Sequence, residues 1–525
     1  MSNTSQFNTL KITINNNQYR VFRNGTAFLF IVGIMLFMYL TSFYSQHSVT
    51  LMIAAMIGGY MAMNIGANDV ANNVGPAVGA RALTLTGAIL IAVVFESAGA
   101  LIAGGSVVTT IKNGIIDPAL IADNNTFIWL MISALFAAAL WLHIATWSGA
   151  PVSTTHSIVG GILGAGVAAG GWQVANLAQL AAIVASWVIS PLMGGVIAAA
   201  FLYFIKRQIT YQEDRLQAAV RVVPWLIMLM SWAFSSYLIL KGLKKIWKVD
   251  FSMALMTGFM IALLVFILVR PLFARAAGRL SNTKRAINRL FTIPLIVSAA
   301  LLSFAHGAND VANAVGPLAA INDAVSQVGN HTNGKAGIPL WVMIVGAAGI
   351  ALGLMLYGPR MIKKVGSEIT ELDQMRAFCI AMSAAITVLI ATQFGLPVSS
   401  THIALGAIFG VGFLRESIKS GYDNMVIDII HHHQDNDPQA VKVFLENFKR
   451  ASVAKKSDML KQLKHHSAKA KLSNKERKRL KKYFTNVLVK RTSLYRIIAA
   501  WLITVPASAL MAAFIFYTIR GFMLT

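Results

Sequence analysis

The sequence predicts an all-α polytopic membrane protein built from two homologous repeats, with about 10–12 transmembrane helices at the ~20 apolar residues that a spanning helix needs. Hydrophobic residues fill 56% of the 525 positions and charged residues only 12%, whereas soluble globular proteins carry about 25% charged residues. The apolar residues fall in runs such as Leu85–Ile111 and Ala178–Ile205, long enough to cross the hydrocarbon core as helices. Composition and run length therefore exclude a soluble fold.

The two repeats are visible as a pair of motifs that recurs in the same order. The motifs are GANDVANNVGP at 66–76 with PVSTTH at 151–156, and GANDVANAVGP at 307–317 with PVSSTH at 397–402. The longer motif differs between its copies only at Asn73 and Ala314. Two motifs repeated in one order at similar spacing indicate a duplicated module rather than chance.

The duplication divides the chain into segments. We expect a polar tail at 1–24, a first transmembrane helix and loop at 25–48, transport repeat 1 at 49–206, a linker at 207–289, transport repeat 2 at 290–415, a basic hydrophilic region at 416–492 and a last transmembrane helix at 493–525. The linker contains two apolar segments, 222–240 and 251–269, and basic residues flank both. Whether both segments cross the membrane is left open by the sequence.

The formal net charge of +25 lies mostly in the hydrophilic region and in short linkers between apolar segments. Basic loops beside spans are typical of the cytoplasmic face of a membrane protein. The charge therefore indicates contact with membrane lipid rather than with nucleic acid. We expect 416–492 to be cytoplasmic and the protein to lie in a plasma membrane, which for a bacterium is the inner membrane.

The GANDVAN segments place carboxylate and amide side chains inside apolar runs. Burying a charge in a bilayer costs at least ~2.5–3.5 kcal/mol, so such residues normally line a polar cavity or meet a partner. Glycine and proline bracket both motifs and predict helix breaks that free backbone carbonyls. Together these oxygens suit Na⁺ or, at the carboxylate, a proton; capping of broken helices is the alternative. The candidate cation-binding residues are Asn68, Asp69, Asn72, Asn309, Asp310 and Asn313.

The PVSTTH and PVSSTH segments predict an anion site. In each, a proline at a first helical turn precedes three hydroxyl residues, and helix N-termini present unpaired N–H groups with a partial positive charge. The candidate phosphate-binding residues are Ser153, Thr154, Thr155, Ser399, Ser400 and Thr401. His156 and His402 close the two segments, either as ligands of the anion or as supports of local backbone. Helix capping and helix–helix packing are the structural alternative.

Glu96 is a carboxylate within the apolar run Leu85–Ile111. Its counterpart in the second repeat is expected near Gly346, where there is no carboxylate. A glutamate in one repeat only breaks the symmetry of the site. We expect Glu96 to pair with a cation or to carry a coupling proton.

On these motifs the sequence resembles the inorganic phosphate transporter (PiT) family over residues 49–415. The resemblance implies inverted repeats, re-entrant helical hairpins and phosphate symport with Na⁺ or H⁺, with no enzymatic activity and no cofactor besides the coupling ion. It matches Asp69 and Asp310 to the signature aspartates, here assigned to sodium, and Glu96 to a glutamate of the first repeat. GAND, in place of a histidine-containing variant, favours Na⁺. A second copy of the chain is a candidate partner.

Other functions remain open. The anion site alone does not separate phosphate from another oxyanion such as sulfate. A membrane-embedded metal hydrolase using Asp69, Asp310, His156 and His402 is a second possibility, although no HExxH spacing is present. A membrane sensor with 416–492 as its effector is the third.

Overall fold

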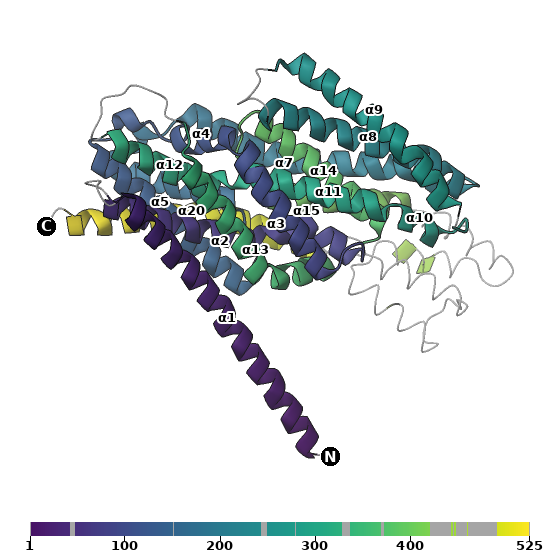
Figure 1. Ribbon diagram of the computed structural model, residues 1–525, viewed down its shortest axis with the longest axis horizontal. Coiled ribbons are helices and arrows are strands. Elements are labelled where there is room, and N and C mark those ends of the chain that lie inside the picture. Colours follow the sequence, from purple (N-terminus) through teal and green to yellow (C-terminus); the bar gives the residue numbers. More distant parts are fainter. Residues whose placement is uncertain are drawn as a thin grey trace. The chain divides into compact units, whose positions relative to one another are not determined.

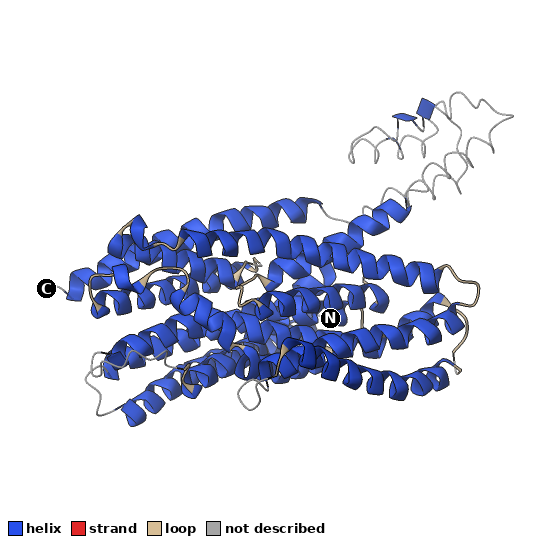
Figure 2. Cartoon of the chain, turned by 90° about the horizontal axis from the view of Figure 1, so that it is seen from above, coloured by secondary structure: helices blue, strands red, loops and turns tan. Residues whose placement is uncertain are grey.

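The computed structural model describes the chain as a bundle of long helices (Figures 1 and 2). It covers residues 2–42, 48–150, 152–242, 249–278, 280–327, 337–368, 372–419, 443–444, 446–447, 459 and 491–523. Within these ranges the β-structure consists of one isolated bridge, between Ile116 and Ala175. Eleven helices in the described residues are long and apolar enough to cross a membrane, as the composition predicts.

The first part of the chain contains the predicted first transmembrane helix, followed by the elements of the predicted repeat 1. These are α1 (Ser2–Ser42), α2 (Ser48–Gly79), α3 (Leu85–Ala103), α4 (Gly105–Asn113), α5 (Asn124–Ser148), α6 (Thr154–Gly170) and α7 (Leu177–Ile205), with 3-10 turns at Pro118–Leu120 and Trp172–Val174 and a π turn at Lys206–Thr210. The predicted tail 1–24 is continuous with α1, whose candidate span is Arg20–Thr41. Helix α5 begins after Asp123, which accepts hydrogen bonds from the backbone N–H and the hydroxyl of Thr126; these bonds lower the pKa of the Asp123 carboxyl.

The second part contains three linker helices, the elements of the predicted repeat 2 and a C-terminal helix. These are α8 (Arg215–Gly242), α9 (Phe251–Ala277) and α10 (Lys284–Leu290), followed by α11 (Thr292–Asp310), α12 (Ala312–Gln327), α13 (Leu340–Glu368), α14 (Gln374–Gln393), α15 (Ser400–Lys419) and the C-terminal α20 (Arg491–Met523). Residues Val411–Arg491 form a separate compact unit. The predicted basic region 416–492 lies largely outside the described residues.

Both linker segments are candidate spans, and α8 and α9 pack as a helical pair. The indole N–H of Trp232 donates to the Leu255 carbonyl at 2.9 Å, and the Ser235 hydroxyl donates to the Gly258 carbonyl at 3.1 Å. At the end of α8, the Lys241 ammonium donates to the Ser106 hydroxyl at 3.2 Å and to the Gln393 carbonyl at 3.3 Å. Lys241, one of the basic residues that flank the two linker segments, thus has hydrogen-bond partners inside the bundle.

The glycines of the GANDVAN segments permit close approach between helices of different repeats. A Cβ at Gly66 would meet the Ile350 carbonyl on α13, and a Cβ at Gly307 would meet the Glu96 carbonyl on α3. Figure 1 shows α2 and α13 side by side at the centre of the bundle. By packing, the counterpart of Glu96 is therefore Ile350, about one helical turn beyond the predicted Gly346 and likewise without a carboxylate.

The predicted helix breaks occur in one repeat only. Helix α2 runs without interruption from Ser48 to Gly79, through Pro76, so the break expected in the first motif is wrong. In the second motif α11 ends at Asp310, and Val311 separates it from α12. In α2, Gly66 allows close contact with the backbone of α13 and does not mark a change in chain direction.

Candidate functional site

Two helix N-termini, those of α6 and α15, form the centre of the site. Ser153 caps α6, its hydroxyl accepting from the His156 N–H at 3.1 Å, and the Ser399 hydroxyl accepts from the His402 N–H at 3.3 Å. Because Ser399 holds the cap position, Pro397 lies outside the helix, contrary to the predicted place in the first turn. Its carbonyl accepts from the Trp187 indole at 3.3 Å. Pro151 lies outside the described residues.

The two N-termini meet. The Thr155 hydroxyl donates to the Val398 carbonyl at 3.0 Å, and the rings of His156 and His402 are 4.6 Å apart. The first backbone N–H groups of a helix have no acceptor within it. Within the described chain, those of Thr154, Thr155, Ser400 and Thr401 make no hydrogen bond. Four N–H groups at two joined helix ends form a cradle suited to a tetrahedral oxyanion.

The two predicted aspartates contact the hydroxyl groups of α15 directly. The Thr401 hydroxyl donates to Asp69 Oδ1 at 3.0 Å, and the Ser400 hydroxyl donates to Asp310 Oδ2 at 2.9 Å. Both carboxylates are fully buried. The candidate cation residues and the candidate anion residues therefore belong to one continuous site.

The motif asparagines tie the two repeats together. The Asn72 amide donates to the Thr401 hydroxyl at 2.8 Å, in the other repeat, and the Asn313 amide donates to Thr154 and Thr155 at 3.2 and 3.1 Å. The outer pair stays within its own repeat, since Asn68 contacts the Thr146 hydroxyl at 3.1 Å and Asn309 the Thr392 hydroxyl at 3.0 Å. These amides thus contact two helix pairs, α5 with α6 and α14 with α15, which we call the repeat 1 and repeat 2 hairpins. This is a structural role distinct from cation binding and from the helix capping considered from the sequence.

His306 is a site residue that the sequence analysis missed. Its ring is fully buried, with Nε2 3.0 Å from Asp310 Oδ2 and 3.8 Å from Asp69 Oδ2, and with Nδ1 3.2 Å from Glu96 Oε2. It directly precedes the second GAND, where the first repeat has Ile65. Extending the comparison of repeats by one residue would have found it.

Glu96 is not isolated. Besides His306, it accepts a hydrogen bond from the Asn73 amide at 2.8 Å. Asn73 is the residue that distinguishes the first long motif from the second, where Ala314 stands. Three differences between the repeats, at Asn73, Glu96 and His306, therefore lie together in one contact cluster.

His156 packs against His402 and against Trp187, whose ring centroid lies 3.8 Å from that of His156. In the described residues the group that could hold a metal ion is Asp69, His306 and Asp310, whose ligand atoms lie within 4.8 Å of one another. The ligand set predicted for a hydrolase, with both cradle histidines, is not the one that the fold brings together.

Eleven candidate spans around a buried, charged site of duplicated motifs define a multi-pass membrane transporter. The sequence pattern of the phosphate transporter family matches residues 65–512. The chain belongs to this family, which supports inorganic phosphate as its substrate.

Individual relatives agree with this assignment. The chain is 54% identical over 501 residues to a protein of Helicobacter pylori strain J99 named "Putative phosphate permease", covering 93% of each chain. It is 38% identical over 370 residues to a protein of the same name from Haemophilus influenzae, covering 69% of this chain and 87% of the relative. A solved structure described as "The sodium-dependent phosphate transporter" is 31% identical, with a TM-score of 0.72, over 90% of this chain and 99% of that one.

Proposed function

We propose that this chain is a secondary active symporter that imports inorganic phosphate across the bacterial inner membrane, driven by a Na⁺ gradient. The observation that carries the proposal is the direct contact between the two motif aspartates and the hydroxyl groups of the cradle, Thr401 to Asp69 and Ser400 to Asp310. One hydrogen bond separates a group that suits a cation from a group that suits an anion.

Charge explains why the two sites belong together. Moving one net negative charge inward against 100 mV, inside negative, costs roughly 2.3 kcal/mol, and each co-transported cation removes that cost for one charge. In this proposal the four free N–H groups, with the hydroxyls of Ser153, Thr154, Thr155, Ser399, Ser400 and Thr401, bind phosphate. Asp69 and Asp310 bind the cation. Movement of one repeat against the other then exposes the site to alternate sides of the membrane.

Na⁺ is favoured because Asp69, Glu96 and Asp310 bring three buried carboxyl groups together, and oxygen atoms of this kind suit Na⁺. These three carboxyl groups surround the imidazole of His306. The structural relative is described as sodium-dependent. A proton is the second candidate for the coupling ion, favoured by the ion-pair distances between His306 and the carboxylates.

The test of the residue roles is phosphate uptake by proteoliposomes. Asp310→Asn should abolish the dependence of uptake on the cation gradient, because it removes a carboxylate of the cation site. Replacing Ser153 and Ser399 together by Ala should raise the KM for phosphate. Cation-driven uptake that is unchanged in Asp310→Asn would remove Asp310 from the coupling step, and an unchanged KM in the double variant would remove the cradle.

Substrate choice needs its own measurement, since N–H groups and hydroxyls do not by themselves separate phosphate from sulfate. Excess unlabelled sulfate should leave the uptake of labelled phosphate unchanged, whereas unlabelled phosphate should suppress it. Equal suppression by the two anions would favour a general oxyanion transporter.

A further inference from the structure

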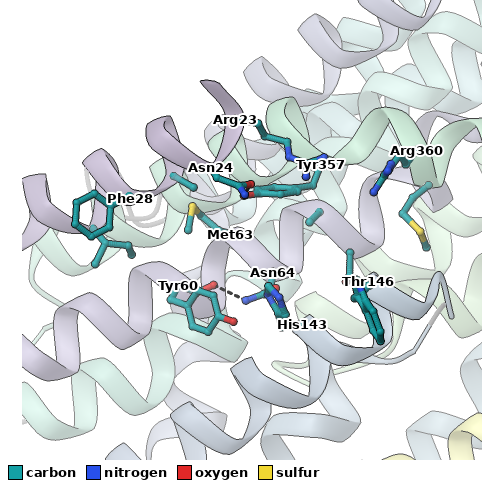
Figure 3. Close-up of a pocket in the computed structure, with 15 residues that line it drawn as sticks. Arg23, Asn24, Phe28, Tyr60, Met63, Asn64, His143, Thr146, Tyr357 and Arg360 are labelled. Carbon is teal, nitrogen blue, oxygen red and sulfur yellow. Dashed lines mark hydrogen bonds between the residues drawn. The ribbon is translucent and has the colours of Figure 1, made fainter. Parts of the chain in front are cut away.

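A cavity with both polar and apolar side chains in its lining lies at the end of the repeat 1 hairpin. Its volume is about 460 Å³, and α1, α2, α5 and α13 supply its walls. We call it the arginine pocket; its polar lining residues are Arg23, Asn24, Tyr60, Asn64, His143, Thr146, Tyr357 and Arg360. Figure 3 shows Arg23, Tyr357 and Arg360 on one side, facing His143 and Thr146 across the cavity.

The charge of the arginine pocket is positive. It contains two guanidinium groups, and no Asp or Glu is among the described residues that line it. The Arg23 guanidinium lies 4.6 Å above the Tyr357 ring, and its buried Nε has no hydrogen-bond partner in the described part of the chain. Neither Arg23 nor Arg360 forms an ion pair with a described residue. Unpaired guanidinium groups with a buried, unused donor favour an anionic ligand, and their planar fork suits a phosphate group.

The arginine pocket shares a contact with the first GANDVAN segment. Thr146 lines the pocket and contacts the Asn68 amide at 3.1 Å, and Asn68 directly precedes Asp69. The pocket therefore borders the motif asparagine next to Asp69.

The equivalent end of the repeat 2 hairpin is covered. The Ser106 hydroxyl donates to the Thr392 carbonyl at 3.2 Å, the Thr110 hydroxyl donates to the Gly395 carbonyl at 2.7 Å, and Lys241 donates to Gln393. Helix α4 and Lys241 thus pack over that hairpin, whereas the repeat 1 hairpin borders the pocket.

Arg360 occupies the place in repeat 2 that Ser106 has in repeat 1. Gly99 and Gly353 make equivalent contacts, with the carbonyls of Phe304 and Met63, and Ser106 and Arg360 each follow their glycine by seven residues. The positively charged Arg360 therefore lies near the repeat 1 hairpin, whereas at the equivalent position the neutral hydroxyl of Ser106 hydrogen-bonds to the repeat 2 hairpin.

We propose that the arginine pocket is a second anion site, which binds a phosphate group through Arg23 and Arg360 on the route between solvent and the cradle. The ligand is either inorganic phosphate, bound before it enters the cradle, or the headgroup of an anionic phospholipid. Both present a phosphate group to the two guanidinium groups. The inference that the pocket binds substrate before transport rests on the proposed function, whereas the inference that it binds a phosphate group does not.

The test compares Arg23→Gln and Arg360→Gln with Arg221→Gln, a control that removes an exposed arginine of α8 outside the pocket. The full chain in lipid-free maltoside detergent is titrated with radiolabelled inorganic phosphate. In parallel, the phospholipid that stays bound to the protein through purification from cells is measured as phosphorus. The same measurement is repeated after reconstitution with phosphatidylcholine alone and with phosphatidylcholine plus phosphatidylglycerol.

If the ligand is inorganic phosphate, wild type and Arg221→Gln show a second, weaker phosphate-binding event that Arg23→Gln and Arg360→Gln lose. The KM for phosphate uptake by the two pocket variants then rises roughly threefold to tenfold. If the ligand is a headgroup, wild type and control retain phosphatidylglycerol and the pocket variants release it. Either selective loss supports the site and identifies its ligand.

Pocket variants that match Arg221→Gln in phosphate stoichiometry and in retained lipid would overturn the proposal. Wild-type proteoliposomes that fail to take up phosphate would instead refute the symport function, and the binding measurement would still report on the pocket.

Discussion

Thr401→Val tests whether the cation and anion sites are linked through one hydroxyl group. That hydroxyl donates to Asp69 at 3.0 Å and accepts from the Asn72 amide at 2.8 Å, and all three side chains are buried. Valine keeps the shape of threonine and removes both hydrogen bonds. Asp69 then keeps His306, at 3.8 Å, as its charge partner among the described residues.

The expected effect follows from these two bonds. A hydrogen bond to a charged group contributes about 1.5–3 kcal/mol, and an amide left buried without a partner adds a cost of about 1–3 kcal/mol. Part of this cost falls on stability, so we expect kcat/KM for phosphate uptake to fall roughly tenfold to hundredfold. The concentration of Na⁺ needed for half-maximal uptake should rise at the same time, because the lost bond orients the Asp69 carboxylate.

Uptake into proteoliposomes, measured against both phosphate and Na⁺, is the assay. Thr401→Ser keeps the hydroxyl and serves as the matched control. Thr155→Val serves as an internal comparison, because within the described residues its hydroxyl bonds to the neutral partners Asn313 and Val398, so the loss should be about twofold to tenfold. If Thr401→Val behaves like Thr401→Ser in its Na⁺ dependence, the hydroxyl does not link the two sites.

The remaining predictions concern the buried charges and the helix contacts. Asp310→Asn should remove the cation dependence of phosphate uptake while phosphate still binds in equilibrium dialysis; loss of both would indicate a misfolded site. His306→Gln and Glu96→Gln should each destabilise the chain in detergent by about 3–5 kcal/mol, and the double variant by less than the sum, since each single change leaves a buried partner alone; additive losses would contradict a direct pairing. Gly307→Ala should lower thermal stability by about 1–3 kcal/mol, because its Cβ would meet the Glu96 carbonyl, whereas Gly33→Ala, with open space around it, should not; equal melting temperatures would contradict the close helix contact.

The residues of the cradle were predictable because their chemistry is local. A proline followed by hydroxyl residues predicts the start of a helix, and its repetition in the second half predicted two such starts. The helices begin later than predicted, because Ser153 and Ser399 hold the cap positions. The motif aspartates were predictable for a similar reason, since a carboxylate in an apolar run requires a polar partner.

The cluster of Asn73, Glu96 and His306 was not predictable in the same way. It depends on the packing of α3 of one repeat against α11 of the other, and no local pattern specifies such a long-range contact. The sequence showed that Asn73 differs between the two nearly identical motifs. Its hydrogen bond to Glu96 is visible only in the folded structure. For the same reason the role of Gly66 was misassigned, because its neighbour on α13 is distant in sequence.

The most direct test of cation-driven phosphate transport is uptake of labelled phosphate by proteoliposomes containing the purified full chain, under separately imposed Na⁺ and H⁺ gradients. We expect an inward Na⁺ gradient to drive accumulation of phosphate above equilibrium, and a proton gradient alone to fail. Accumulation that follows only the proton gradient would contradict sodium coupling and assign the buried cluster around His306 to a proton. The absence of accumulation under both gradients would contradict symport itself.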